Sequence, residues 1–539
     1  FALDGAAGAH ADDGGDDDVD RDDVDDVLGT GLLRRAKTEA QGRLGQRVPI
    51  AIIDIGSNSI RQVVYEGLTR APSILFNEKV LCGLGKGVAR TGALEEMAAE
   101  RALNAIQRFY RVGKQLGVEE THVLATAATR EASNGAEFIS RIEAITGQKI
   151  RLLSGRMEAE YAAFGIKSGF FKPEGIAGDL GGGSMELIEV NGNVTNGVTT
   201  PLGGLRLQEL SGADLKVALK IARKTVQSVN VNWPGESRTF FAIGGTWRSL
   251  ARLHMLENGH PVDVVHGYSI PASDYIEFCE KITSGLQDTF ANIDEISKNR
   301  RPLLPFGAAV MVAVIEHLGV ETVSTSAVGL REGYMYSLLD EDIREKDALL
   351  EATAELSILR ARSPVYCREL SDWTERALAE FGLEESESQR RWRIAACNLA
   401  DIAWRSASDF RAEQTLGIIN NAGFNSIRHE GRAYLALVTF HRYQGLGAKK
   451  TPPDIAALAS DSTIKLARVT AALFRVAYLF SAAIEGVLPR LTFSRNEEGE
   501  LILKVPKDIS EMNGEKPQSR VEALARELGE SMVILTEES

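Results

Sequence analysis

The stretch GIAGDLGGGSMELIEV, residues 175–190, decides the fold prediction. An apolar run leads into an acid, three glycines and a serine, and a second apolar run follows. Glycine adopts backbone angles that other residues avoid, so the N–H groups of Gly181, Gly182 and Gly183 can point into one concavity. Such a nest binds anions, phosphate above all. A tight β-hairpin without a ligand is the alternative interpretation.

The side chains around this turn add a metal to the prediction. Ser184 supplies a hydroxyl, whereas ionised Asp179 and Glu186 can only accept hydrogen bonds and would repel a bare phosphate. A hard cation such as Mg²⁺, placed between these carboxylates and the phosphate oxygens, removes that conflict. We therefore expect Mg²⁺ as the cofactor, and leave a dependence on a monovalent cation such as K⁺ open.

The same pattern occurs once more in the chain. Residues 50–67 read IAIIDIGSNSIRQVVYEG, again a strand, D-x-G-x-x-S and a strand. Asp54, Gly56 and Ser59 stand 125 positions before their counterparts in the second turn. An internal repeat of this length predicts two related lobes, whose facing turns would hold one oligophosphate and its metal in a cleft. Chance recurrence of the motif is the alternative.

Length and composition fit a large globular protein. The 539 residues predict about three domains. No run of about 20 apolar residues occurs, so no membrane span is expected, and the longest candidate, 469–484, contains Arg475 and predicts a buried helix. The cysteines are far apart and indicate neither a metal-ligand pair nor a disulfide framework, which favours a reducing cytoplasm; they are Cys82, Cys279, Cys367 and Cys397.

The net charge of −14 is concentrated at the start of the chain. Residues 1–28 hold eleven Asp and one Arg and contribute −10, which leaves −4 for the remainder. This segment predicts a disordered acidic tail over 1–47, either solvating or docking a basic partner. The nearly neutral remainder does not indicate specific nucleic-acid binding.

The pattern of elements divides the rest of the chain. Strands and helices alternate over 48–172 and again over 173–339, which predicts an α/β fold of two lobes. Helical patterns dominate over 340–490, and a small β/α extension follows over 491–539. Within the second lobe, 239–256 predicts a strand, a glycine turn and a helix, an arrangement that presents backbone N–H groups to an anion.

Together these motifs carry a family resemblance. The paired turns, with ATAATREASNG, LLSGRMEAE and AIGGTWRSLARL, resemble the exopolyphosphatase/guanosine pentaphosphate phosphatase (Ppx/GppA) family, which shares the actin, heat-shock chaperone and sugar kinase superfold. The resemblance covers roughly residues 48–490. It implies two ribonuclease-H-like lobes around a cleft, followed by a helical domain similar to HD-type phosphohydrolases. It also implies a homodimer.

The resemblance assigns roles to matching positions. Phosphate binding is implied for both turns and for two arginines that face the cleft: Gly56, Ser57, Asn58, Ser59, Arg61, Arg130, Gly181, Gly182, Gly183, Ser184 and Arg300. Metal binding is implied for Asp54, Asp179 and Glu186. A solvated strand arginine is the alternative for Arg61, and surface salt bridges are the alternative for Arg130 and Arg300. A one-residue slip would exchange Arg300 with Arg301.

The catalytic base of the family corresponds to Glu158. Phosphoanhydride hydrolysis needs one activated water aligned with the leaving group, and a carboxylate within hydrogen-bond reach can supply that activation. The family often has N-E-E-A here, whereas this chain has R-M-E-A-E, so Arg156 and Met157 depart from the pattern. Without the resemblance, Glu158 would be interpreted as a structural glutamate at a helix start.

The helical domain lacks the His-Asp dyad of HD hydrolases, because none of the eight histidines precedes an aspartate. Asn420 and Asn421 are poor ligands for a catalytic metal, and His429 is expected to be a surface or satisfied histidine. We therefore predict a structural domain that contributes substrate surface or dimer contacts. Four arginines at 390–405 could form a basic track for a polyanion, with a solvated helix start as the alternative: Arg390, Arg391, Arg393 and Arg405.

The favoured function is an exopolyphosphatase that releases orthophosphate from the ends of inorganic polyphosphate. A guanosine pentaphosphate phosphohydrolase is the alternative within the same family. A sugar or acetate kinase would need a full adenosine site, which the glycine turn at 242–246 does not supply. A non-catalytic phosphate or nucleotide sensor has little use for the base and the paired acids.

Overall fold

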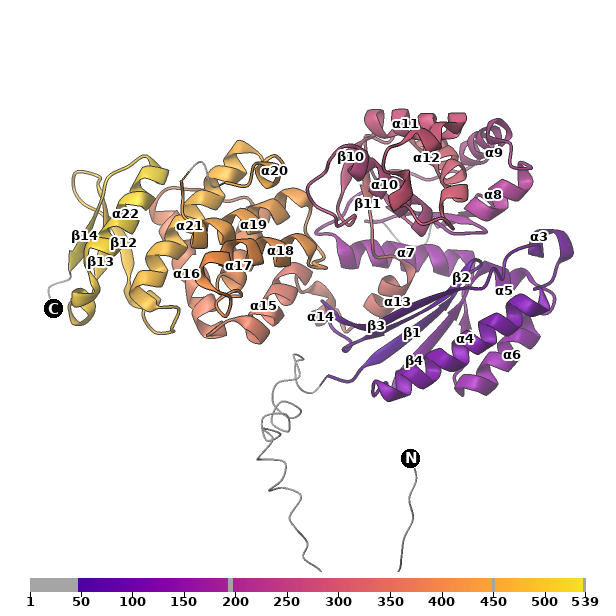
Figure 1. Ribbon diagram of the computed structural model, residues 1–539, viewed down its shortest axis with the longest axis horizontal. Helices are drawn as coiled ribbons and strands as arrows, with labels where there is room; N and C mark the ends of the chain where they lie inside the picture. The colour runs from indigo at the N-terminus through magenta and orange to yellow at the C-terminus, as the bar shows by residue number, and fades with distance from the viewer. Residues whose placement is uncertain (1–46, 192–196, 448–450, 537–539) are drawn as a thin grey trace, which may run out of the picture. The chain divides into compact units, whose positions relative to one another are not determined.

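The computed structural model describes residues 47–191, 197–447 and 451–536 (Figure 1). The acidic tail predicted over 1–47 falls almost wholly outside the described residues. Arg47 is the first described residue, and it donates a hydrogen bond of 3.1 Å to Glu355 in the helical domain.

The first lobe is built on a five-stranded sheet in the order β3-β2-β1-β4-β5. β1, β2 and β3 pair antiparallel, and β4 and β5 continue the sheet in parallel. This is a ribonuclease-H-like topology. The strands are β1 Ile50–Ile55, β2 Ser59–Tyr65, β3 Ile74–Leu81, β4 Glu120–Ala125 and β5 Ile150–Leu152.

Both faces of this sheet are covered. α4 (Glu96–Gln115) and α6 (Gly135–Thr146) pack against one face, which is visible in Figure 1. The other face carries Ile50, Ile52 and other apolar residues, and it packs against Tyr334 and Met335 of α13 (Leu330–Leu338). The short helices α3 (Val88–Thr91) and α5 (Ala127–Glu131) lie in the connections.

The second sheet repeats the first and adds an edge strand, in the order β10-β11-β9-β6-β7-β8. β6, β7 and β8 form the antiparallel part, and β9 and β11 follow in parallel. The repeat inferred from the paired turns is therefore present in the topology. The strands are β6 Ile176–Leu180, β7 Met185–Glu189, β8 Val198–Thr200, β9 Thr239–Ile243, β10 Ser269–Pro271 and β11 Thr322–Thr325.

Helices pack on the outer face of this sheet and form one apolar core with it. They are α8 Gly204–Leu210, α9 Leu215–Gln227, α10 Gly245–Glu257, α11 Ala272–Lys281 and α12 Leu304–Leu318. The stretch Arg301–Leu318 is long and apolar enough to cross a membrane by length and composition, but two thirds of it is buried in the protein. The segment 469–484 falls largely within α21 (Asp461–Ser481), most of whose side chains are buried, as expected from the sequence.

Two helices are exchanged between the lobes. α7 (Gly155–Gly169) follows the first sheet in sequence, but Ala159, Ala163 and Ile166 pack against Phe241 and the inner face of the second sheet. α13 follows the second sheet in sequence and covers the first. The linear boundaries at 172 and 339 therefore do not separate two independent packing units.

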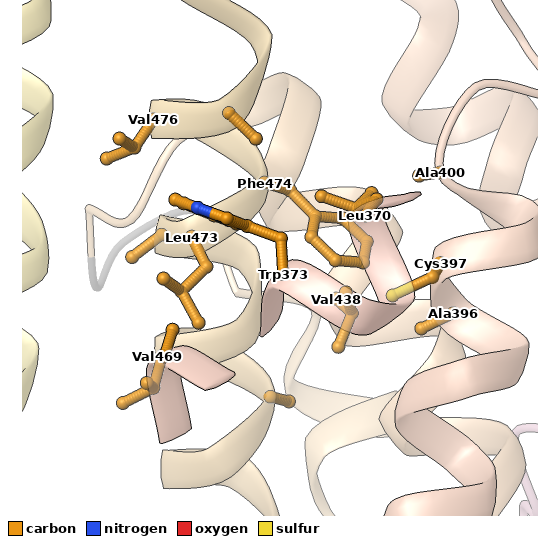
Figure 2. Packing of buried hydrophobic residues seen from close by; sticks show 14 of the residues in the cluster. Leu370, Trp373, Ala396, Cys397, Ala400, Val438, Val469, Leu473, Phe474 and Val476 are labelled. Carbon is orange, nitrogen blue, oxygen red and sulfur yellow. The ribbon is translucent and has the colours of Figure 1, made fainter. Parts of the chain in front are cut away.

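The region after 340 is helical and has its own core, formed mainly by buried side chains of α16, α17, α19 and α21. Figure 2 shows Trp373 among Leu370, Val438 and Phe474, and its indole N–H donates to the Leu491 carbonyl at 2.9 Å. The helices are α14 Glu341–Glu345, α15 Ala348–Arg360, α16 Pro364–Glu380, α17 Glu387–Leu399, α18 Arg411–Asn421, α19 His429–Gln444, α20 Pro453–Ala456 and α21 Asp461–Ser481.

The chain closes with a three-stranded sheet in the order β12-β13-β14 and one helix. The strand-like segment and the final helix predicted for this extension are β12 (Thr492–Arg495), β13 (Leu501–Val505) and α22 (Glu515–Leu528). β14 (Met532–Thr536) pairs in parallel with β13 and was not predicted. All four cysteines are described, and each is a buried free thiol.

Candidate active site

The two D-x-G-x-x-S turns have the same local structure. In the first turn, the Gly56 N–H donates to the Ser59 carbonyl at 3.1 Å, and in the second the Gly181 N–H donates to the Ser184 carbonyl at 2.9 Å. Each turn closes a hairpin, β1-β2 or β6-β7. The aspartate before each turn therefore lies at the end of a strand, where it can face a ligand bound by the glycines.

The turns face each other across a cleft of about 220 Å³. A Cβ atom built on Gly182 would lie 3.4 Å from the Cβ of Ser57, and one on Gly183 would lie 3.5 Å from its Oγ. Fourteen of the fifteen predicted site residues line the cleft, and only Arg130 is absent from the lining: Asp54, Gly56, Ser57, Asn58, Ser59, Arg61, Glu158, Asp179, Gly181, Gly182, Gly183, Ser184, Glu186 and Arg300.

The register of the two hairpins gives the two turns different charges. Asp54 pairs with Arg61 across β1 and β2, whereas Asp179 pairs with Glu186 across β6 and β7. Arg61 and Glu186 thus occupy equivalent positions in the repeat. The first turn presents one acid and one cation, and the second presents two acids.

Glu158 lies in the first turn of α7, which begins at the N-cap Ser154. The guanidinium of Arg130 donates to Glu158 Oε1 at 2.6 Å and also contacts the Leu153 carbonyl. Burial raises the pKa of Glu158 to about 7, although Arg130 opposes the rise and the nearby acids add to it. Arg130 therefore contacts the carboxylate of Glu158 instead of lining the cleft as predicted.

The three acids of the two turns are also hard to ionise. Burial raises the pKa of Asp179 to about 6, with Arg248 opposing the rise. Burial likewise raises the pKa of Asp54, which accepts a 3.0 Å hydrogen bond from Arg331. The pKa of Glu186 rises well above its ordinary value because of burial and the neighbouring Glu158. These carboxylates lie close enough to repel one another when no cation is bound.

The cations of the cleft are correspondingly crowded. Burial and the nearby Arg300 lower the pKa of Lys79 to about 8. Arg300 lines the cleft, and a Cβ on Gly245 at the start of α10 would overlap its guanidinium. Arg301 instead forms a 2.8 Å ion pair with Asp294 outside the lining. The structure therefore places Arg300, not its neighbour, at the site.

Comparison with known proteins decides the family. The model of the Ppx/GppA phosphatase family matches residues 63–342, more than half of the chain. The chain belongs to the Ppx/GppA phosphatase family. A second model, the C-terminal region of exopolyphosphatase, matches residues 349–535.

Individual Ppx/GppA relatives are distant. Retrograde regulation protein 2 of Saccharomyces cerevisiae is 26% identical over 73% of this chain and 72% of that protein. Guanosine-5'-triphosphate,3'-diphosphate pyrophosphatase of Aeromonas hydrophila is 28% identical, over 55% of this chain and 62% of that protein, slightly under two thirds of its length. Exopolyphosphatase 1 of Mycobacterium leprae is 27% identical, over 54% and 90%.

Solved structures of Ppx/GppA proteins are similar to part of the chain. The Aquifex aeolicus member of the Ppx/GppA family is 24% identical, with a TM-score of 0.46 over 54% of this chain and 97% of that chain. An exopolyphosphatase from Cytophaga hutchinsonii is 21% identical, with a TM-score of 0.48 over 54% and 97%.

Sequence reasoning missed four charged residues of the cleft: Lys79, Arg248, Arg331 and Glu332. Arg331 and Glu332 follow Gly329 at the start of α13, and Glu332 accepts hydrogen bonds from the Gly329 N–H at 2.9 Å and the Tyr65 hydroxyl at 3.0 Å. The strand–turn–helix pattern at 323–339 was a usable signal, because 239–256 has the same pattern. Lys79 lies in β3, where the sequence carries no comparable signal.

A metal ion in this Ppx/GppA cleft would have to take some of its ligands from the bound substrate. Within the described ranges, no three His, Cys, Asp or Glu side chains are grouped closely enough to hold a metal. Mg²⁺ usually takes one or two carboxylates and completes its shell with phosphate oxygens and water. Glu186 Oε1 is buried without a hydrogen-bond partner, so an oxygen ligand is available. The residues therefore fit Mg²⁺ together with a bound phosphate.

The structure refines the prediction for His429 in the helical domain. His429 is buried, and its ring contacts His260 at 2.7 Å and the Val264 carbonyl at 2.9 Å, so it is a satisfied histidine and not a surface one.

The predicted arginine track is wrong for two of its members. Arg393 is fully buried, and Arg391 is buried between Asp347 and the Ser426 carbonyl. Arg390 is exposed and pairs with Glu375 at 2.8 Å. α17 packs between neighbouring helices, so residues three apart on it do not share an exposed edge.

Proposed function

We propose that the cleft hydrolyses the terminal phosphoanhydride bond of inorganic polyphosphate and releases orthophosphate. The observation that carries this proposal is the position of Glu158, a buried carboxylate with a raised pKa that faces two phosphate-binding turns. A general base is most effective when its pKa lies near the working pH. The exopolyphosphatase among the relatives supports the same substrate class.

The residues of the cleft divide the work of hydrolysis. Backbone N–H groups of the two glycine turns bind the terminal phosphates, and Arg61, Lys79 and Arg300 neutralise their charge. Glu158 accepts a proton from the attacking water, while Arg130 holds its carboxylate in place. Catalysis of phosphoryl transfer rests mainly on such positioning and charge stabilisation.

Asp179 and Glu186 are the residues that would hold Mg²⁺, with Asp54 facing them from the first lobe. A bound Mg²⁺ supplies charge neutralisation at the phosphate oxygens. Without it, the acids of the second turn would repel the substrate, because both carry negative charge when ionised.

The test is orthophosphate release by the full chain from long polyphosphate, guanosine pentaphosphate and ATP, measured side by side with Mg²⁺. Faster release from polyphosphate supports the proposal. Faster release from guanosine pentaphosphate assigns the alternative activity, which the Aeromonas relative supports. Binding of these compounds without release from any of them would indicate a sensor and refute a hydrolase.

Gly203 offers a test of the second turn. A Cβ on Gly203 would overlap the backbone of Gly182 and Gly183, so Gly203→Ala must displace the phosphate-binding turn. Misplacement of about 1 Å can cost roughly 10²-fold in rate, and we expect kcat/KM for polyphosphate to fall by about 10–100-fold. Gly204→Ala is the matched control, because a Cβ there meets nothing within 4 Å. Equal kinetics for the two variants would contradict this account of the turn.

The metal ligands can be tested by titration. Asp179→Asn and Glu186→Gln should each raise the Mg²⁺ concentration needed for half-maximal activity, because hard cations prefer charged oxygen ligands. Glu131→Gln is the control, since Glu131 lies outside the cleft lining and pairs with Arg206 at 3.5 Å. Titration curves that superimpose on that of the parent protein would show that the two acids are structural.

A further inference from the structure

A second cavity lies between the helical domain and the C-terminal extension, remote in sequence from both turns. Its volume is about 360 Å³, within the roughly 300–1,000 Å³ typical of small-molecule sites. α19, α21 and α22 contribute most of its wall. The charged residues that line it are all cations: Arg362, Arg411, Arg442, Arg475, Lys516 and Arg520.

One carboxylate lies behind this lining. Asp401 is almost completely buried and accepts two hydrogen bonds of 2.7 Å from Arg362 and one of 3.1 Å from Arg442. Its oxygens are thus already used by two guanidinium groups. Within the part of the chain that the structure describes, the other four cations of the cavity form no ion pair.

The arginines are held in place by backbone carbonyls. Arg475 donates to the carbonyls of His441 at 3.2 Å and Arg442 at 2.6 Å, in the last turn of α19. Arg411 donates to the carbonyls of Ser406 at 3.0 Å and Trp404 at 2.8 Å. Carbonyl contacts fix the guanidinium groups but do not cancel their charge.

Donor capacity remains unused in the cavity. The side chain of Arg442 is only 4% exposed, and its Nε–H is buried without a hydrogen-bond partner. A buried donor that lacks a partner destabilises the folded state by about 1–3 kcal/mol. Burial and the neighbouring Arg520 and Arg442 lower the pKa of Arg475 to about 10. Both observations indicate that, without a counter-anion, the cavity holds an unpaired donor and cations that repel one another.

From this geometry we infer that the cavity is a binding site for a compact small molecule that carries several phosphate groups, separate from the catalytic cleft. Several phosphates are needed because four unpaired cations surround the space, and guanidinium groups bind phosphate through paired N–H donors. Arg362 and Arg442 already lie over the ring of Tyr478 at 5.5 Å and 5.3 Å. The ring is therefore covered, and the cavity offers a ligand charged groups instead of a free aromatic face.

The test is calorimetric binding to the full chain with three probes: inositol hexakisphosphate, tripolyphosphate and ATP. The two anhydrides are measured in a Glu158→Gln background so that turnover does not interfere. Lys516→Ala/Arg520→Ala removes two cations that form no side-chain hydrogen bond or ion pair within the described residues. Hydrogen bonds to charged groups contribute about 1.5–3 kcal/mol each, so we expect at least about tenfold weaker binding of one or more probes.

Lys216→Ala/Lys220→Ala is the matched control, because these exposed lysines on α9 give the same change of net charge far from the cavity in sequence. The control should bind the probes as the parent does. The unliganded Lys516→Ala/Arg520→Ala protein should melt no lower than the parent, because it loses like-charge repulsion. Preference among the probes then separates ring esters, linear anhydrides and nucleotides.

Long polyphosphate is titrated in parallel in the Glu158→Gln background. Three results would overturn the inference: no probe binds outside the catalytic cleft, the two double variants weaken binding equally, or long polyphosphate binds through Lys516 and Arg520 while none of the three compact probes does. The last result would make the cavity part of a polymer path instead of a small-molecule site.

Discussion

Glu158→Gln should lower turnover of the preferred phosphoanhydride by roughly 10²–10⁴-fold, the range typical of a lost general base. The glutamine keeps the shape of the side chain and can still accept a hydrogen bond from Arg130, which donates at 2.6 Å in the parent protein. Substrate binding should survive, because both glycine turns remain intact. The measurement is steady-state phosphate release together with binding of the substrate to the variant.

The pH profile adds a second readout for the same residue. The carboxylate must be deprotonated to accept a proton, and burial raises its pKa to about 7. Activity of the parent should therefore rise through about pH 7 and fall as the pH drops below it, and Glu158→Gln should lose this limb.

Glu160→Gln is the matched control for Glu158→Gln. Glu160 lies two residues further along α7 and pairs with Arg156 at 3.2 Å outside the cleft. Near-parent turnover in Glu158→Gln, or an equal loss in both variants, would remove Glu158 from the role of base.

Arg393→Leu should destabilise the helical domain by about 3–5 kcal/mol, the effect of breaking a buried ion pair by removing one partner. Arg393 is fully buried and donates to Glu385 at 2.9 Å and to the Ser371 carbonyl at 3.0 Å. Leucine would leave the Glu385 carboxylate buried without its cation. The free energy of unfolding can be measured in urea by tryptophan fluorescence.

The sign of the pH dependence distinguishes this loss from a simple loss of packing. Without Arg393, burial raises the pKa of Glu385 further, and a protonated carboxyl needs no cation. The destabilisation should therefore shrink as the pH falls from 8 toward 5.

Arg390→Leu is the control on the same helix. Its partner Glu375 is exposed, with 2.8 Å between the charged atoms, and exposed pairs contribute only about 0–1 kcal/mol. Similar losses in the two variants would contradict the burial that the structure assigns to Arg393.

The two turns could be predicted from the sequence because their structure is local. In D-x-G-x-x-S the glycine N–H bonds to the serine carbonyl of the same hairpin, so a segment of six residues determines the geometry. The duplication then predicted two lobes, and both sheets have the corresponding strand order. Glu158 needed the family resemblance, because one glutamate at a helix start resembles many others.

The remaining charges of the cleft depend on tertiary contacts that no short segment encodes. Arg331 reaches Asp54 across 277 positions of sequence, and Lys79 enters from an edge strand. The prediction for Arg393 was wrong because helical spacing alone placed it on an exposed edge beside Arg390. In the structure, Glu385 and α16 bury Arg393, whereas Arg390 stays exposed. Periodicity identifies the face of a helix and does not identify what covers that face.

During synthesis, the strands of the first sheet are made long before the helix that covers one of its faces. β1 begins at Ile50, but α13, which covers the second face of the first sheet, begins at Leu330. Ribosomes add roughly 5–20 residues per second, so the apolar face that contains Ile52 and Val63 lacks its α13 contacts for on the order of tens of seconds, although Tyr161 of α7 packs on the same face. During that interval the nascent chain is a client for holding chaperones. We therefore expect any aggregation in a foreign host to begin on nascent chains, before α13 has been synthesised.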